Sequence, residues 1–246
     1  MKLVIQEAPS LKSAIDSIAS LVEEGVFEVK KDGLQLKAMD PSQISMVSFT
    51  MPKSAFVEYS VEEETKLGLD ISQFVNILAR GKKGEKAELT LEEGRLVVKF
   101  FTDKRKRTFK VPILDIGSGL SKELKIDYAN YARINADALK EALKDAKLVS
   151  SHVRLILEPN AFIVDVKGEG GDVRAEFEKG DEVSEIQTAV QTKATFPLQY
   201  LEDIVKAASG SSPVTINLET DRPLKVEYDI EKAKVVYYLA PRIESE

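Results

Sequence analysis

The chain has 246 residues, 43% of them hydrophobic, and a formal net charge of −6. This length allows one large or two medium domains, and 31% charged residues is typical of a globular rather than a disordered chain. The lack of cysteine excludes disulfides, thiol nucleophiles and thiolate metal sites. No apolar run approaches the roughly 18 residues of a membrane span, and the N-terminus lacks a signal-peptide core. We therefore expect a soluble intracellular protein with no membrane partner.

Four short helices separated by strands are predicted along the chain. The helices begin near Ser10, Ile71, Asp137 and Pro197. In the last of them proline stands in the first turn, where its missing N–H costs nothing. Alternation of apolar and polar residues predicts strands that include residues 30–38, 87–91, 158–166 and 214–218.

The two halves of the chain repeat each other at an offset of about 128 residues. In the first helix of each half, Leu11, Lys12, Ala14 and Ile15 fall on Leu139, Lys140, Ala142 and Leu143. In the second, Ile71, Phe74, Ile77 and Leu78 fall on Leu198, Leu201, Ile204 and Val205. The matched order of elements predicts a tandem duplication of an α+β domain. We place the N-terminal domain at residues 1–110, a connecting loop at 111–127 and the C-terminal domain at 128–246.

The predicted third helix sorts its residues into three stripes. Its apolar face consists of Ala138, Leu139, Ala142, Leu143 and Ala146. Lysines flank this face at positions 140, 144 and 147, and a separate acidic strip contains Asp137, Glu141 and Asp145. One interpretation is a solvated surface with i,i+4 ion pairs. The other is that the lysines and the carboxylates serve two different partners.

Few residues point to catalysis. His152 is the only histidine, which excludes a histidine-based triad and a multi-histidine metal site, and a structural role is the simplest one for it. The GKKGEK segment at residues 81–86 lacks the spacing and the Ser or Thr of a phosphate-binding loop. We therefore expect a protein that is not an enzyme and needs no metal or cofactor.

The polar faces of the predicted helices are small and lightly charged. The first carries Lys12, Ser13, Asp16, Ser17 and Ser20, and the second Ser72, Gln73, Asn76 and Arg80. A helix that reads DNA sequence would carry several Arg or Asn side chains directed at base edges. These faces suit loose contact with phosphates instead, and ordinary solvated helices remain the alternative.

Four segments of the chain resemble the proliferating cell nuclear antigen sliding clamps: residues 32–49, 107–116, 144–153 and 222–246. The AMD and YLAPRI motifs are especially specific to that family, and the lack of Cys and Trp is closer to its archaeal members. The resemblance spans the whole chain. It implies a duplicated processivity-clamp fold, in which each of two similar domains packs two short helices on antiparallel sheets.

The resemblance also implies a function. Three subunits would form a homotrimeric pseudo-sixfold ring around duplex DNA, without sequence specificity and without catalysis. Its partners in replication and repair would be DNA polymerase, a clamp loader, flap endonuclease and DNA ligase, at the nucleoid in the cytoplasm or, in a eukaryote, in the nucleus. The alternative is a protein-binding scaffold that keeps the duplicated fold but forms no ring.

The resemblance assigns residues to three surfaces. The duplex-facing positions are Lys12, Lys144 and Lys206, with Arg80, Lys82, Lys83, Lys140 and Lys147 as neighbours. A pocket for partner peptides would contain Met39, Gln43, Ile44, Leu120, Leu124, Pro223, Tyr238, Ala240 and Pro241, although core packing is the alternative for Met39 and Tyr238. At the subunit interface the resemblance implies an edge pairing of the strand near residues 105–111 with that near 172–180 of a neighbour. From the charge stripes themselves we predict that Asp137, Glu141 and Asp145 meet the basic residues Arg80, Arg105 and Arg107 of the neighbour beside this pairing.

Overall fold

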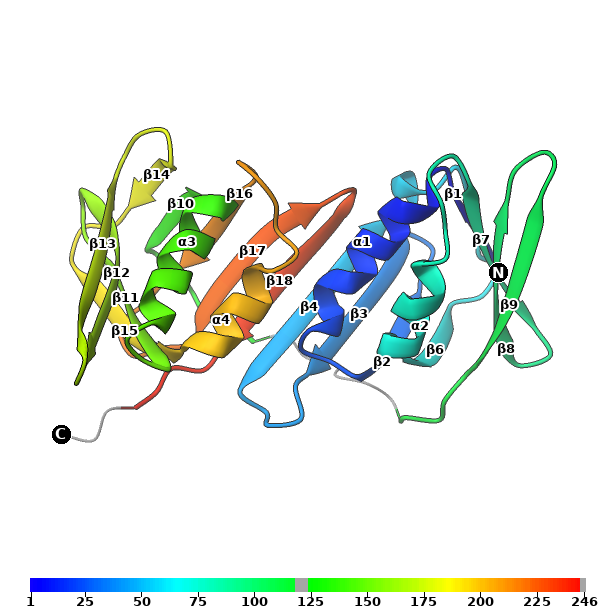
Figure 1. Cartoon of the computed structure of the whole chain (residues 1–246). Coiled ribbons are helices and arrows are strands. Elements are labelled where there is room, and N and C mark those ends of the chain that lie inside the picture. Colours follow the sequence, from blue (N-terminus) through cyan, green and yellow to red (C-terminus); the bar gives the residue numbers. More distant parts are fainter. Residues whose placement is uncertain (118–123, 244–246) are drawn as a thin grey trace. The chain divides into compact units, whose positions relative to one another are not determined.

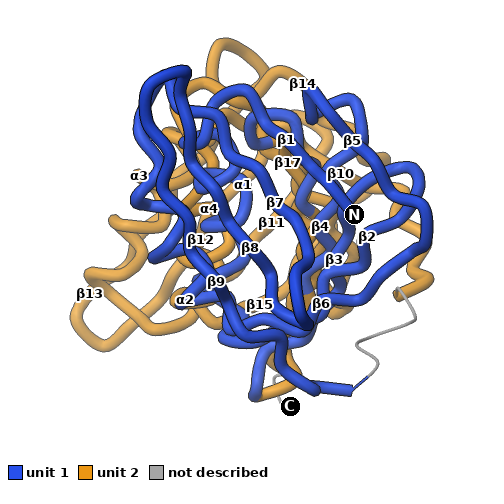
Figure 2. The backbone as a smooth tube through the Cα atoms, turned by 90° about the vertical axis from the view of Figure 1, so that its right-hand side faces the viewer, with its two compact units in different colours: residues 1–41, 47–123, 230–235 blue, residues 42–46, 124–229, 236–246 orange. Residues whose placement is uncertain are grey.

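A computed structural model describes residues 1–117 and 124–243 of the chain (Figure 1). The chain divides into two compact units, which are coloured separately in Figure 2. Unit 1 contains residues 1–41, 47–123 and 230–235, and unit 2 contains residues 42–46, 124–229 and 236–246. Each unit therefore includes a short segment from the other half of the sequence.

Unit 1 contains two runs of strands and two helices. The first run has the order β5-β1-β7-β8-β9, with β5 at Glu58–Ser60, β1 at Lys2–Ile5, β7 at Lys86–Glu92, β8 at Arg95–Phe101 and β9 at Lys106–Pro112. The second has the order β4-β3-β2-β6, with β4 at Ser45–Pro52, β3 at Gly33–Met39, β2 at Glu24–Val29 and β6 at Thr65–Asp70. The helices are α1 at Ala8–Ala19 and α2 at Ile71–Leu78, and a 3-10 turn, η1, lies at Lys53–Ala55.

Unit 2 repeats this arrangement. Its first run has the order β14-β10-β16-β17-β18, with β14 at Val183–Gln187, β10 at Tyr131–Asn135, β16 at Pro213–Asn217, β17 at Leu224–Ile230 and β18 at Ala233–Leu239. Its second has the order β13-β12-β11-β15, with β13 at Gly171–Glu178, β12 at Ala161–Gly168, β11 at His152–Leu157 and β15 at Thr192–Pro197. The helices are α3 at Ala136–Lys147 and α4 at Leu198–Val205. The predicted duplication of an α+β domain is confirmed strand by strand.

The helix ends follow local sequence signals, with two corrections to the predicted starts. Asp70 and Asn135 cap α2 and α3, each by accepting a hydrogen bond from the backbone N–H three residues later. Helix α1 begins at Ala8, earlier than predicted, and Pro9 occupies its first turn. Pro197 is instead the last residue of β15 and precedes α4, because its backbone is still extended.

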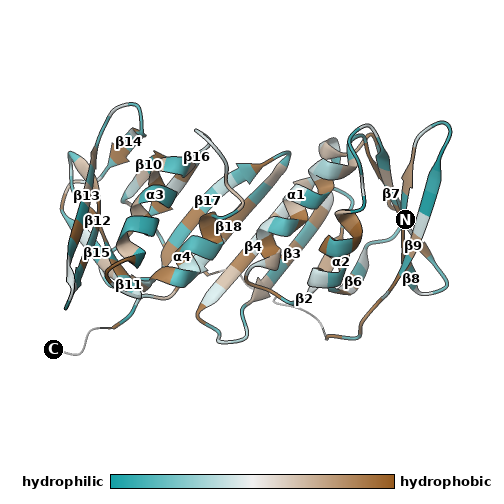
Figure 3. Cartoon of the chain, in the orientation of Figure 1, coloured by the Kyte–Doolittle hydropathy of each residue, from teal (hydrophilic) through white to brown (hydrophobic). Residues whose placement is uncertain are grey.

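Each helix packs its apolar stripe against the strands of its own unit, while its opposite face remains hydrophilic (Figure 3). In unit 1, Phe27 makes edge-on contacts with Phe49 and Phe74, with ring centroids 6.3 and 6.1 Å apart. In unit 2 the largest fully buried side chains include those of Phe162 and Tyr237. These cores hold the polar helix faces in fixed positions.

The chain leaves unit 1 along strand β6. Leu114 donates its N–H to the carbonyl of Gly68 at 2.8 Å. A Cβ at residue 68 would lie only 2.1 Å from the Leu114 carbonyl oxygen, so this close approach requires glycine. The start of the predicted connecting loop is thus fixed to the sheet, and β9 extends to Pro112 within the range assigned to that loop.

Candidate binding surfaces

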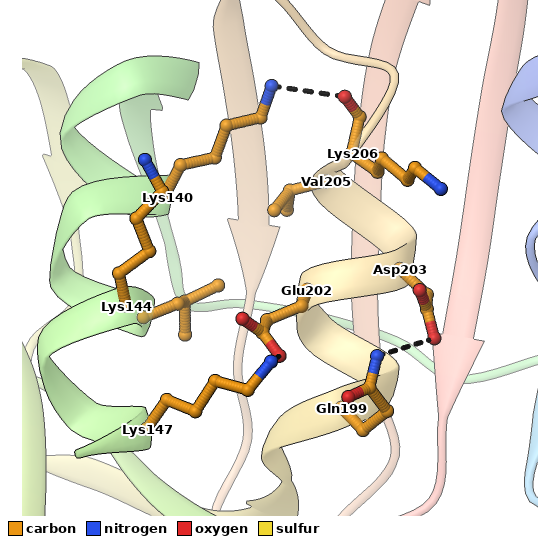
Figure 4. Close-up of a pocket in the computed structure, with 9 residues that line it drawn as sticks. Lys140, Lys144, Lys147, Gln199, Glu202, Asp203, Val205 and Lys206 are labelled. Atoms are coloured by element: carbon orange, nitrogen blue, oxygen red, sulfur yellow. Dashed lines mark hydrogen bonds and ion pairs between the residues drawn. The ribbon is translucent and has the colours of Figure 1, made fainter.

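The polar faces of α3 and α4 border an open groove of about 320 Å³ (Figure 4). Four of the predicted duplex-facing lysines line it together with polar and apolar neighbours: Lys140, Leu143, Lys144, Lys147, Gln199, Glu202, Asp203, Val205 and Lys206. The structure thus brings together three lysines of α3 and one that directly follows α4, two segments that are far apart in the sequence. It also places the acidic side chains of Glu202 and Asp203 among them.

Two of these lysines form ion pairs with carboxylates of unit 2. The Lys147 ammonium lies 2.7 Å from the Glu202 carboxylate, across the groove. The Lys144 ammonium lies 2.5 Å from Glu141, and this hydrogen bond raises the pKa of Lys144. Glu141 was assigned to a separate acidic strip, so the interpretation in terms of local ion pairs applies at this position. Asp137 and Asp145 on the same helix are exposed.

Lys140 is held by backbone rather than by a carboxylate. Its ammonium donates to the carbonyl of Lys206 at 3.1 Å and to the carbonyl of Ala208, both of which follow the last turn of α4. Burial lowers the pKa of Lys140, an effect that nearby Asp137 opposes. Figure 4 shows the Lys206 side chain extending away from this contact. Lys140 therefore closes the end of α4, a role that its position in the lysine stripe did not indicate.

The predicted duplex-facing residues of unit 1 lie on α1 and on the loop after α2. Lys12 pairs with Asp16 one turn along α1, at 2.6 Å. Arg80, Lys82 and Lys83 are exposed in the loop that joins α2 to β7. Unit 1 therefore presents its positive charge mainly from a loop, whereas unit 2 presents it from helices.

A buried carboxylate organises that loop, and sequence reasoning missed it. Glu85 accepts hydrogen bonds from the Lys82 N–H and from the Arg107 guanidinium of β9. Burial acts to raise the pKa of Glu85, but these two hydrogen bonds, together with the positive charges of Arg107 and Arg105, outweigh it and the pKa is lowered. Arg107 also donates to the Arg80 carbonyl at 2.8 Å and lies over the Phe100 ring at 5.4 Å. Its guanidinium, predicted to face a neighbouring subunit, is thus engaged inside unit 1.

The outer strands of two runs carry opposite charges. Strand β9 ends the five-stranded run of unit 1 and bears Lys106, Arg107 and Lys110. Strand β13 ends the four-stranded run of unit 2, and its charged residues are Asp172, Arg174, Glu176 and Glu178. Apart from Val111, which is buried, their side chains are exposed or half-buried. These are the two strands that the family resemblance pairs between subunits.

A tyrosine that was not predicted contacts residues predicted for the peptide pocket. Tyr128 packs against a buried cluster of Met46, Val236 and Tyr238, and its hydroxyl donates to the Pro223 carbonyl at 2.8 Å. Burial raises the pKa of the Tyr128 phenol. The only signal in the sequence was an aromatic residue directly after the predicted connecting loop.

The other predicted pocket residues divide between the units. In unit 2, the N–H of Ala240 donates to the carbonyl of Ile44 at 2.8 Å. Pro241 follows Ala240 in the chain, and the side chains of Gln43 and Leu124 in the same unit are exposed. Met39 is 37% exposed and belongs to unit 1, whereas Tyr238 is only 5% exposed, so it packs in the core. Leu120 lies outside the described residues.

Within residues 1–117 and 124–243, no helix has the length and hydrophobicity to cross a membrane. The same part of the chain contains no group of three His, Cys, Asp or Glu side chains arranged to hold a metal ion. His152 begins strand β11, where its Nδ1 lies 3.1 Å from the Ser151 hydroxyl.

Comparison with known proteins gives matches over both halves. Residues 1–117 match the family model of the proliferating cell nuclear antigen N-terminal domain, and residues 125–243 match that of the C-terminal domain. A DNA polymerase sliding clamp of Methanococcus maripaludis is 37% identical over 95% of this chain and 96% of its own length. One from Thermococcus onnurineus is 30% identical over 99% of this chain and 98% of its own.

Two solved structures have the same fold. Proliferating cell nuclear antigen from Thermococcus kodakaraensis superimposes with a TM-score of 0.92 at 27% identity, over 98% of this chain and 99% of that one. A. fulgidus PCNA, bound to the C-terminal region of FEN-1, gives a TM-score of 0.90 at 26% identity, over 100% of this chain and 99% of that one.

Proposed function

This chain belongs to the proliferating cell nuclear antigen family, and we propose that it acts as a DNA polymerase sliding clamp. Three copies form a ring around duplex DNA and hold polymerases and other replication and repair enzymes on it. The match of both domains along almost the whole chain is the observation that carries this proposal. The ring performs no catalysis and works at the nucleoid in the cytoplasm.

The outer strands support a closed ring. A ring needs head-to-tail contact between two unlike surfaces, and the basic strand β9 and the acidic strand β13 are unlike. Opposite charges beside an edge pairing favour the correct neighbour and discourage pairing of like edges. Further exposed charge comes from Arg80 and Arg105 in unit 1 and from Asp137, Glu141 and Asp145 in unit 2. Because Arg107 is engaged by Glu85, Arg105 is the better residue at which to probe the contact.

The duplex-facing surface supports retention by topology. Lys12, Lys144 and Lys147 already have carboxylate partners, and Lys140 has carbonyl partners. Few lysines therefore offer a phosphate contact without competition, and DNA binding that rests on few phosphate contacts is weak and sensitive to salt. A closed ring needs no stronger contact, because the DNA duplex passes through it and cannot dissociate sideways.

Retention on circular and linear DNA tests this function. Light scattering should give a mass near three times 27.3 kDa. After loading by a clamp loader, the protein should persist on circular plasmid DNA and be lost when one restriction cut opens the circle. Equal retention on both forms, or a monomer at micromolar concentration, would contradict the ring and favour a scaffold that kept the fold alone.

We also propose that the surface around Tyr128, Ile44 and Ala240 binds apolar and aromatic peptides of partner enzymes, among them flap endonuclease, DNA ligase and polymerase. Unit 2 carries a half-buried aromatic residue, Tyr128, and an exposed apolar one, Leu124, and such residue types suit an anchor-in-pocket contact. In calorimetry with a synthetic peptide from a FEN-1 C-terminal region, Leu124→Ala should weaken binding several-fold. Val190→Ala, at another exposed apolar residue of unit 2, is the control and should bind as the wild type does.

A further inference from the structure

We propose that Glu202 is a built-in competitor for DNA phosphate: it occupies Lys147 in the duplex-facing groove and thereby keeps the ring's contact with DNA weak. The inference rests on the proposed sliding-clamp function and adds to it a residue that tunes how strongly the ring interacts with the duplex. Glu202 was not among the residues predicted for any surface.

The geometry of the pair supports this role. Lys147 is the last residue of α3, and Glu202 lies in the middle of α4, so the ion pair spans the groove between the two helices (Figure 4). Nζ and Oε2 are 2.7 Å apart. The Glu202 side chain is only 20% exposed, whereas that of Lys147 is 55% exposed. The carboxylate is therefore the more buried member of the pair, and the ammonium remains accessible to a second anion from solvent.

The duplication provides an internal comparison. With the offsets of 128 between the first helices and 127 between the second helices, Lys147 corresponds to Ala19 and Glu202 to Val75. Unit 1 thus has neither charge at the equivalent positions. The unit that carries the additional lysine also carries the additional carboxylate, which indicates that the two residues act as a pair.

A phosphate that contacts Lys147 competes with the Glu202 carboxylate for the same ammonium. The gain from the new contact is then reduced, because the phosphate must weaken or replace the existing ion pair, and both anions exchange readily because exposed ion pairs are weak. Lys144 with Glu141 and Lys12 with Asp16 follow the same pattern on the duplex-facing helices. Weak, exchangeable contacts allow a ring to move along DNA without stopping.

The test is the Glu202→Gln variant, which keeps the shape of the side chain and removes its charge. Rings loaded on long DNA with blocked ends are followed by single-molecule fluorescence. We expect one-dimensional diffusion to slow by up to about fivefold relative to the wild type, since an exposed ion pair is replaced by a phosphate contact. The salt dependence of diffusion should steepen, because each added phosphate contact makes DNA binding more sensitive to salt. In a plot of the logarithm of the binding constant against the logarithm of the salt concentration, one contact contributes a slope of about −0.9.

Two further variants separate local release of Lys147 from a change in net charge. Glu28→Gln removes the same charge from strand β2, where Glu28 pairs with Lys30 just after the strand and with Lys66 of β6. Glu28 is outside the predicted duplex-facing residues, so this variant should diffuse as the wild type does. Adding Lys147→Gln to Glu202→Gln should restore fast diffusion. Unchanged diffusion of Glu202→Gln, or equal slowing by Glu28→Gln, would overturn the inference while the ring itself remains on DNA. A wild type that is lost from circular DNA would instead overturn the proposed function, and this inference with it.

Discussion

At the ends of α2 and α4, the two units use different residues to provide a cation for backbone carbonyls. The last carbonyls of any helix lack partners within the helix, and a cation beside them is favourable. After α2, the Arg80 carbonyl is bound by Arg107 from β9. After α4, the carbonyls of Lys206 and Ala208 are bound by Lys140 from α3. The duplication therefore preserves where a cation is needed but not which element supplies it.

The equivalent lysines of the repeat make the same point. Lys12 and Lys140 occupy matching positions on α1 and α3. Lys12 pairs with Asp16 on its own helix, whereas Lys140 reaches a different helix. Roles of polar residues thus do not transfer from one half to the other, even though the apolar positions do.

The largest expected effect is at the end of α2, because Arg107 also neutralises a buried carboxylate. Arg107→Ala leaves Glu85 without its charged partner, and we expect the free energy of unfolding to fall by about 3 kcal/mol. Urea unfolding followed by far-ultraviolet circular dichroism measures this, since the chain has no tryptophan. Lys53→Ala, at an exposed residue of the 3-10 turn η1 in the same unit, is the control and should change the free energy little. A similar loss of unfolding free energy in both variants would mean that the buried Arg107–Glu85 pair stabilises the protein no more than an exposed lysine does.

An intermediate effect is expected at Tyr228, whose hydroxyl donates to the Ile204 carbonyl of α4 at 2.7 Å. Tyr228→Phe should destabilise the protein by about 1 kcal/mol. Burial raises the pKa of Tyr228 to about 12, above the ordinary value of 10.0. The stability from this group is then complete below pH 10 and is lost as the pH rises toward 12.

Stability at alkaline pH also depends on a buried tyrosine of unit 1. Tyr59 of unit 1 donates to the Lys30 carbonyl at 2.6 Å, and burial, aided by Asp32 and Glu64, raises its pKa to about 12. Urea unfolding at pH 9 and pH 11 should therefore show a smaller alkaline loss for Tyr228→Phe than for the wild type, with part of the loss retained by Tyr59. An alkaline loss as large as that of the wild type would exclude Tyr228 as a source.

The smallest effect distinguishes the equivalent lysines. Lys140→Met removes the cation at the end of α4 and should cost about 1 kcal/mol. Lys12→Met removes only an exposed pair on one helix and should cost about 0.3 kcal/mol. Both are measured by urea unfolding at pH 7 and moderate salt. Equal costs would show that the contact with the α4 carbonyls adds nothing to a surface ion pair.

The sequence predicted what depends on periodicity and missed what depends on distant partners. The apolar stripes around Leu11 and Leu139 were sufficient to locate the helices and to detect the duplication. The role of Lys140 was not predictable, because its partners near Ala208 become neighbours only when α3 and α4 pack together. The role of Glu85 was not predictable for the same reason. It lies among basic residues in the sequence, and its burial and its ion pair depend on β9. The predicted subunit and peptide contacts stay predictions.

The exchange of short segments between the halves has a consequence for the history of the chain. Residues 230–235 belong to unit 1, and residues 42–46 belong to unit 2. A gene cut between the two repeats would therefore encode two fragments, each lacking a piece of its own compact unit. The copies that arose by duplication are no longer interchangeable modules, and either one would have to be re-engineered at these segments before it could be inherited alone.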